Sequence, residues 1–302
     1  MTADPTRGYI DAMRNAKPLL ALFVLLTWLH TPSHADEPAA PAGATTYRSP
    51  YFLEFSYSTD ALIGDLLRGP LGDPRTISAV PYDSWNSAAV RKKYGAWGPP
   101  MKRLEPSPEL AQRPAQWKRE RVIAVASHYV GCTYQHHHLP DWNPPADWPW
   151  KEVGHGSNAK GVDCSNFTGL VYNLALGVRM STEIVQQGAD EEITVNGEGA
   201  RKQHVTLIPK PATYEACLKD LRTGDLLYIL NKQKEVSHVV IWVGTVGRSP
   251  SDVPLVIDST GSSHKDSSHL TIPDGVQLRP FTRTGWYFQS LSHVHRIISD
   301  SE

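Results

Sequence analysis

The stretch that decides the fold is Asp163-Cys164-Ser165-Asn166-Phe167-Thr168. Small polar residues surround the cysteine, and the residues after it have helical spacing as far as Gly177, a typical helix stop. Polar neighbours would be costly to bury beside an inert thiol, and the free N–H groups of a helix start favour the thiolate. The pattern therefore predicts a nucleophilic cysteine at the start of a helix over 165–176, rather than a buried structural cysteine.

Two later polar residues stand beside apolar runs that are typical of strands. His238 opens one such run and Asp258 closes another. An imidazole can take a thiol proton, and a carboxylate can fix the tautomer of that imidazole. Taken alone, His238 fits a solvent-exposed strand edge equally well, but together with Cys164 it is the natural base. We prefer Asp258 as the orienting residue because it ends a strand directly, and His264 and His269 are the alternatives.

Helical patterns come before strand patterns in this chain. Helical spacing covers 117–129 and 165–176, and five short β-type runs follow. The β-type runs are 226–230, 238–243, 255–257, 276–278 and 294–298. This order predicts an α+β domain in which N-terminal helices pack on an antiparallel β-sheet.

The chain divides into four predicted parts. Residues 1–35 combine a basic start, a short apolar run and small residues before Ala35, which indicates a secretory signal; an uncleaved membrane anchor is the alternative. Residues 36–46 are rich in Pro and Ala and indicate a flexible linker. Residues 47–115 form an N-terminal arm or small module of unclear fold, and 116–300 form the catalytic domain.

Charge and cysteine content narrow the possible partners. The net charge of -1 argues against a nucleic-acid partner, because phosphate binding needs a surplus of Lys and Arg. Three cysteines in an exported chain leave at least one thiol unpaired. If Cys164 is the free one, a Cys132–Cys217 disulfide is possible.

Several blocks, in order along the chain, resemble the NlpC/P60 family of papain-like cell-wall cysteine peptidases. Asp163-Cys164-Ser165 is similar to the family's nucleophile block, and His238 opens a strand similar to the family's histidine strand. Gly224-Asp225-Leu226 resembles the block that precedes a strand in the family, and Gly131-Cys132-Thr133-Tyr134 falls where the family has Gly-x-Pro-Tyr. Asp258 falls where the third polar residue is expected.

The resemblance implies a papain-like core that cleaves amide bonds in peptidoglycan stem peptides. It implies that Cys164 is the nucleophile, His238 the base and Asp258 the orienting residue. Tyr134 is similar to the family tyrosine beside the nucleophile, and Asp163 and Ser165 resemble residues that line the substrate pocket. No metal or other cofactor is expected. The expected partners are peptidoglycan peptides in the periplasm or cell envelope, with no stable membrane insertion after signal cleavage.

The chain also departs from the family pattern. Asn166 stands where the family usually has Gly, and the third residue is most often His rather than Asp. The family's Trp-Gly-Gly is replaced by an insertion over 135–161, which contains His136-His137-His138 and several tryptophans. The histidines fit either a metal site or a solvated loop. The tryptophans fit either a wall of the substrate cleft or a cover for an apolar flank.

Two other functions remain open from the sequence. The same thiol chemistry serves an acyltransferase, or an amidase that acts on a substrate other than peptidoglycan. A catalytically silent cell-wall binding protein is the non-enzymatic alternative.

Overall fold

The computed structural model describes residues 47–299 apart from 70, 72, 141–160, 197, 198 and 263. The predicted signal (1–35) and linker (36–46) lie outside the described residues, as does most of the insertion. Thr46–Glu302 forms one compact unit, so the described segment before residue 116 packs in the same body as Cys164, His238 and Asp258.

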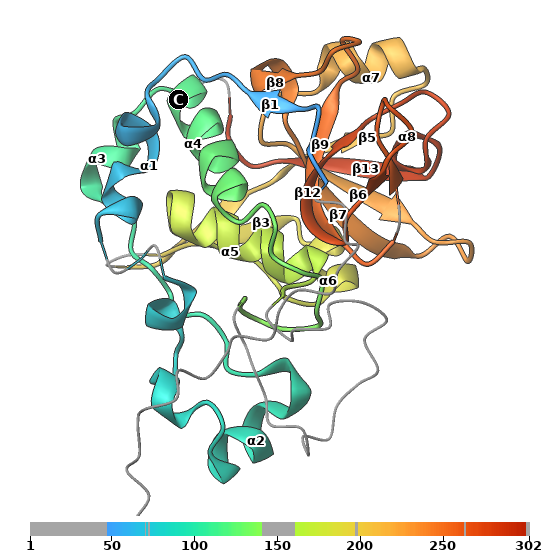
Figure 1. Cartoon of the computed structure of the whole chain (residues 1–302). Helices are drawn as coiled ribbons and strands as arrows, with labels where there is room; N and C mark the ends of the chain where they lie inside the picture. Colours follow the sequence, from blue (N-terminus) through green and yellow to red (C-terminus); the bar gives the residue numbers. More distant parts are fainter. Residues whose placement is uncertain are drawn as a thin grey trace, which may run out of the picture. The chain divides into compact units, whose positions relative to one another are not determined.

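A six-stranded antiparallel sheet forms the centre of this unit (Figure 1). In spatial order its strands are β12 (Gly275–Pro280), β9 (Leu255–Thr260), β7 (Val236–Trp242), β6 (Leu226–Leu230), β13 (Leu291–Arg296) and β5 (Thr206–Pro209). All five β-type runs of the sequence lie in this sheet, although the bounds of four of them differ from those predicted. The prediction of an α+β fold with an antiparallel sheet is confirmed.

Helices and small sheets surround the central sheet. The helices are α1 (Thr59–Leu67), α2 (Ala88–Tyr94), α3 (Pro108–Ala111), α4 (Ala115–His128), α5 (Cys164–Leu176), α6 (Ile184–Ala189), α7 (Tyr214–Asp220) and α8 (Trp286–Gln289). The small sheets are β2 (Val178–Arg179) with β3 (Glu192–Val195) and β4 (Arg201–His204), β1 (Phe52–Leu53) with β8 (Gly247–Arg248), and β10 (His264–Lys265) with β11 (Thr271–Ile272).

Both faces of the central sheet are buried. Because successive strand residues point to opposite faces, Leu226 and Tyr228 of β6 pack with α4 and α5, whereas Leu227 and Ile229 pack with α7 and α8. Figure 1 shows α4 and α5 on one side of the sheet and α7 and α8 on the other. Burial on both faces explains why the strands read as nearly continuous apolar runs.

The helix that begins with the cysteine follows its local sequence signals. The Asp163 carboxylate accepts a hydrogen bond from Asn166 N at 3.0 Å and caps the helix start. Gly177 ends the helix in a left-handed conformation, with a φ of 64°. Both ends were predicted to within one residue, because caps are local signals.

Two predicted strand ends are wrong. β9 does not end before Asp258 but continues to Thr260, and β7 begins at Val236, so His238 lies inside its strand. Asp258 pairs with Gln277 of β12 and Thr260 pairs with Gly275. This pairing satisfies the backbone N–H and C=O groups of β9, so the strand continues although its last residues have polar side chains. Two side chains that were predicted at strand ends therefore lie on rigid strands.

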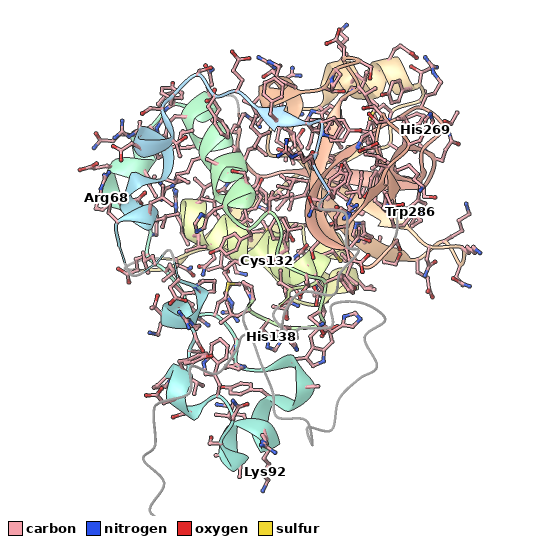
Figure 2. The ribbon with its side chains drawn as sticks, viewed as in Figure 1. Arg68, Lys92, Cys132, His138, His269 and Trp286 are labelled. Atoms are coloured by element: carbon pink, nitrogen blue, oxygen red, sulfur yellow. The ribbon has the colours of Figure 1, made fainter. Side chains whose placement is uncertain are left out.

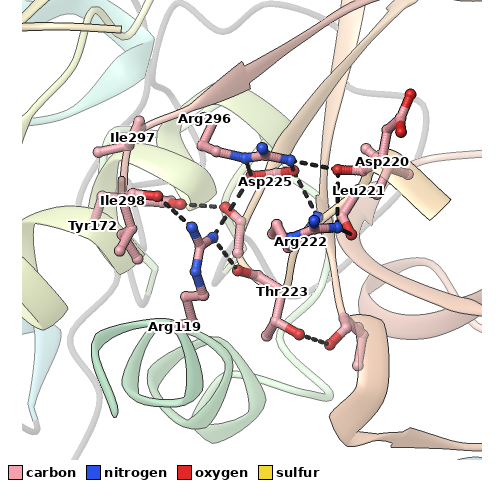
Figure 3. Close-up of polar contacts among 12 residues, drawn as sticks. Arg119, Tyr172, Asp220, Leu221, Arg222, Thr223, Asp225, Arg296, Ile297 and Ile298 are labelled. Carbon is pink, nitrogen blue, oxygen red and sulfur yellow. Dashed lines mark hydrogen bonds and ion pairs between the residues drawn. The ribbon is translucent and has the colours of Figure 1, made fainter. Parts of the chain in front are cut away.

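The Gly224-Asp225 block is part of the framework of the fold (Figure 3). Gly224 has a φ of 88°, a conformation that favours glycine. Asp225 is buried, and it accepts hydrogen bonds from Arg296 Nη2 and from Arg222 N, both at 2.8 Å. Arg119 of α4 donates to the backbone oxygen of Thr223 at 3.0 Å and so ties the helix to this turn. The block fixes the start of β6.

The segment before α4 is joined to the helices by buried polar contacts. Arg121 of α4 pairs with Asp65 of α1 at 2.7 Å, and Glu120 accepts a hydrogen bond from Ser56 N at 2.7 Å. Asn173 of α5 donates to the backbone oxygen of Lys102 at 3.0 Å. These bonds hold the N-terminal segment against α4 and α5.

The possible Cys132–Cys217 disulfide is not formed, since none of the three cysteines is part of a disulfide. Cys217 lies in the apolar cluster between the sheet and α7, where burial raises the pKa of its thiol to about 11. Within the described residues, no helix combines the length and apolar character needed to cross a membrane.

Candidate active site

Cys164 is the first residue of α5 and is only 6% exposed. The N–H groups of the first helical turn have no acceptor within the helix, and they stabilise negative charge near the N-terminus, where Cys164 lies. Helix α5 packs against β7 and β9, the strands that carry His238 and Asp258. The hydroxyl of Ser259 donates to the backbone oxygen of Val162 at 2.5 Å and anchors the chain just before the cysteine to β9.

His238 and Asp258 are joined by a short hydrogen bond. The distance from His238 Nε2 to Asp258 Oδ2 is 2.6 Å, and both side chains are buried. This bond occupies Nε2 and leaves Nδ1 as the nitrogen that can face Cys164. The Cys164 thiol acts on the same imidazole through its charge and a hydrogen bond.

The protonation of this pair follows from its surroundings. Burial alone would lower the pKa of His238, but the charge of Cys164 and the hydrogen bond that His238 donates to Asp258 outweigh it and raise the pKa to about 10. Burial would raise the pKa of Asp258, but the guanidinium of Arg279 and then His238 lower it to about 2. At neutral pH the arrangement therefore favours a His238 imidazolium held against an ionised Asp258 carboxylate.

The two alternatives for the orienting residue are placed differently. The ring of His264 stacks on Tyr287 at 5.1 Å, and its Nε2 lies 3.4 Å from the Tyr287 hydroxyl. Burial lowers the pKa of His264 to about 4, so this histidine is neutral at pH 7. His269 lies in a turn beyond it, with a φ of 61°. Of the three candidates for the orienting residue, Asp258 is the one that accepts the hydrogen bond from His238 Nε2 in the described part of the chain.

Tyr134, Asp163 and Ser165 surround the cysteine. Burial, followed by the charges of Cys164 and Asp163, raises the pKa of Tyr134 well above its ordinary value. Ser165 Oγ donates to the backbone oxygen of Thr182 at 2.7 Å and contacts Asp163 at 3.2 Å. Asp163 and Ser165 are both buried and make bonds within the protein.

Asn166 gives a structural reason for the departure from the family's glycine. Its Nδ2 donates to Asp163 Oδ2 at 2.8 Å, while its backbone N–H donates to Oδ1. The side chain thus holds both oxygens of the capping carboxylate. Its own Oδ1 is buried and has no hydrogen-bond partner among the described residues.

The histidine run packs against the N-terminal segment. The indole of Trp97 lies 5.3 Å from the ring of His136 and 5.8 Å from that of His138, and His136 in turn contacts Tyr134 at 5.4 Å. His138 Nδ1 bonds to the backbone oxygen of Gly98 at 2.8 Å (Figure 2). Within the described residues, no group of three or more potential metal ligands is found. The tryptophans at 142, 148 and 150 lie outside those residues.

Three residues of the site were missed by the sequence analysis. Arg279 Nε lies 2.8 Å from Asp258 Oδ1, and the Tyr287 hydroxyl donates to Asp258 Oδ2 at 2.9 Å. Trp286 stacks on the His238 ring at 5.3 Å and remains 37% exposed, which leaves part of the indole open to solvent. The alternation Val276-Gln277-Leu278-Arg279, which puts an arginine on a buried strand, is the one signal that could have revealed Arg279.

The large cavity of the described chain is separate from this site. Its volume is about 870 Å³, and it lies between the start of α4, the end of α7 and β8. Cys164, His238 and Asp258 are not among the residues that line it. Most of its cationic groups are held within the protein: Arg119 and Arg222 bond backbone oxygens, and Arg248 pairs with Glu54.

Comparison with known proteins gives one family match. The model of the NlpC/P60 family matches residues 152–292, a range that includes Cys164, His238 and Asp258. Residues 152–292 are therefore assigned to the NlpC/P60 family. Members of the NlpC/P60 family are generally cell-wall peptidases, typically cysteine peptidases or amidases. A search of curated proteins finds no match.

Two solved structures of NlpC/P60 proteins are similar to the chain. One is a family protein from Bacillus cereus, 16% identical with a TM-score of 0.35; the match covers 60% of this chain and 40% of that one. The other is the NlpC/p60 domain of the peptidoglycan hydrolase SagA, 17% identical with a TM-score of 0.32, and this match covers 59% of this chain and 98% of the domain.

Proposed function

We propose that the chain is an exported cysteine hydrolase that cleaves amide bonds in peptidoglycan stem peptides. The observation that carries the proposal is the 2.6 Å bond between His238 and Asp258, on an imidazole whose pKa is also raised by Cys164. Membership of the NlpC/P60 family supports the choice of peptidoglycan as substrate. The signal pattern of residues 1–35 supports export to the periplasm or cell envelope.

The proposed reaction uses the three residues in turn. Cys164 Sγ attacks the amide carbonyl carbon, and the oxyanion that forms is stabilised by the backbone N–H of Cys164. The His238 imidazolium donates its proton to the leaving amine nitrogen, the C–N bond breaks and a thioester remains. Neutral His238 then takes a proton from water, which attacks the thioester and releases a carboxylate and the thiol. Asp258 holds the ring in position throughout.

Tyr134 and Asp163 are the proposed substrate contacts closest to the nucleophile. The charges of Cys164 and Asp163 both act on the Tyr134 hydroxyl, which supports a role for this hydroxyl as a donor to a substrate carbonyl next to the reacting bond. The Ser165 hydroxyl donates a hydrogen bond to Asp163 Oδ1 at 3.2 Å and helps to hold this carboxylate in place. Trp97 and His136 extend this wall away from the thiol, and we assign them to the binding of the peptide.

The proposal is tested by digestion of purified muropeptides with the mature chain and with Cys164→Ala. We expect new peptide fragments from the wild-type chain only, and equal digestion by both would reject the proposal. Addition of an amine or alcohol acceptor separates hydrolysis from acyl transfer, because transfer gives a product heavier by the acceptor. A silent binding protein would instead show a Cys164 thiol that reacts with iodoacetamide no faster than a model thiol.

A further inference from the structure

The carboxylate of Asp258 is shared between three partners that come from three different elements. His238 of β7 and the Tyr287 hydroxyl of α8 both bond to Oδ2, at 2.6 and 2.9 Å. Arg279 of β12 bonds to Oδ1 at 2.8 Å through Nε. Asp258 and Arg279 are each 0% exposed. The oxygen that Arg279 binds is therefore not the oxygen that orients His238.

The register of two strands puts Arg279 in this place. Asp258 of β9 is directly opposite Gln277 of β12, and Arg279 lies two residues further along β12, on the same face. Diagonal neighbours of this kind are within reach of a long side chain. Arg279 Nη2 also donates to the backbone oxygens of Pro273 and Gly275, at 2.9 and 3.1 Å, which fixes the plane of the guanidinium.

Arg279 balances the charges of the site. Backbone oxygens carry no net charge, and Asp258 is the carboxylate that pairs with Arg279 within the described residues. When Cys164 is the thiolate that the proposed reaction requires and His238 is an imidazolium, these two residues together with Asp258 and Arg279 hold two anions and two cations. Without Arg279 the group would hold one uncompensated anion, which a buried site strongly disfavours. A neutral histidine as third residue would need no such cation, whereas an aspartate does.

We propose that Arg279 is a positioning residue of this site, which keeps Asp258 ionised so that the carboxylate can hold the His238 imidazolium opposite Cys164. The proposal rests on the proposed role of Cys164 as nucleophile but not on the identity of the substrate. The other titratable groups near Asp258 are Tyr287, which donates to it, His264, which is neutral and lies 3.4 Å from the Tyr287 hydroxyl, and Tyr134, whose raised pKa is due in part to the charge of Asp258.

The test is the pH dependence of Cys164 alkylation by iodoacetamide, measured by peptide mass spectrometry, in the wild-type chain and in Arg279→Gln. An opposite charge at this distance lowers a carboxyl pKa by roughly 1 to 3 pH units. Loss of Arg279 raises the pKa of Asp258 and makes the site more negative. Both effects require a higher pH for the reactive thiolate, so the acid limb of the rate profile moves up by roughly one pH unit.

Two variants separate positioning from a structural role. Arg279→Lys retains the positive charge, so the acid limb of its rate profile should coincide with that of the wild-type chain. Its Cys164 should be alkylated more slowly, because lysine cannot make the hydrogen bonds of Arg279 Nη2 to the backbone oxygens of Pro273 and Gly275. Arg283→Gln is the matched control: Arg283 is exposed and pairs with Glu215, so its profile should coincide with that of the wild-type chain. A folded Arg279→Gln chain with an unshifted profile would overturn the proposal, as would an equal shift in Arg279→Lys.

If Arg279→Gln does not fold, a compensating pair decides. Asp258→His leaves the Arg279 charge buried without a carboxylate, and the added Arg279→Gln change removes that charge. We expect the double variant to be more stable to heat and more reactive at Cys164 than Asp258→His alone. A double variant no better than the single one would overturn the proposal. Failure of muropeptide digestion with these alkylation results intact would reject the substrate and leave the role of Arg279 standing.

Discussion

The pKa of His238 is the property of the site that depends most on its neighbours. At about 10, against 6.5 for a free histidine, it corresponds to about 5 kcal/mol of preference for the imidazolium. Burial opposes this preference, and the charge of Cys164 is the first of the contributions that raise the pKa of His238, ahead of its hydrogen bond to Asp258. We therefore predict that Cys164→Ala lowers the pKa of His238 by roughly 2 pH units, equivalent to about 3 kcal/mol.

The assay is an NMR titration of the imidazole C–H signals in histidine-labelled protein, with His238→Gln used to assign the signal. Cys217→Ala is the matched control, because Cys217 is also buried but lies in the cluster under α7 as a neutral thiol. The control should leave the titration of His238 unchanged. If His238 titrates at the same pH with and without the Cys164 thiol, the two side chains do not form an ion pair and the reasoning fails.

Three further predictions follow from the fold and the site. The pKa of Asp258 is about 2, against 3.8 for a free aspartate, so its ionised form contributes stability above pH 4, and this contribution is lost as the pH falls toward 2. In urea titrations, the difference in unfolding free energy between wild type and Asp258→Asn should therefore narrow by about 2 kcal/mol over that pH range. Gly224→Ala should lower the unfolding free energy by about 1 kcal/mol, because the φ of Gly224 is 88°. Gly169→Ala inside α5 should not destabilise, because the new methyl group meets its nearest neighbour at 3.8 Å. A larger loss of unfolding free energy for Gly169→Ala than for Gly224→Ala in urea titrations would contradict this. Trp97→Ala should raise KM for muropeptides about tenfold with kcat nearly unchanged if Trp97 binds substrate, and a fall in kcat alone would argue against that role.

The parts of the fold that could be predicted from sequence are those with local causes. Asp163 caps α5 and Gly177 ends it through bonds within a few residues, so the sequence pattern contains the whole signal. The apolar runs of β6 and β7 are likewise direct consequences of burial on both faces. The end of β9 was wrong because Asp258, Ser259 and Thr260 are polar yet buried, and their partners lie far away in the sequence.

The same distinction applies to the candidate site. Cys164, His238 and Asp258 could be proposed because each stands next to a recognisable helix start or strand. Arg279 and Trp286 could not, since their proximity depends on the β9–β12 register and on the docking of α8. The side chain of Asn166 looked like an anomaly in sequence, and only the structure shows that it holds the Asp163 carboxylate.

The central claim is that Cys164 forms the acyl bond during amide cleavage. The most direct measurement is an acid quench of the mature chain during turnover of purified muropeptides, followed by peptide mapping by mass spectrometry. We predict a peptide acyl group on Cys164, with Cys132 and Cys217 unmodified and with no cleavage by Cys164→Ala. Full cleavage by Cys164→Ala, or an acyl group on any other residue, would contradict the account.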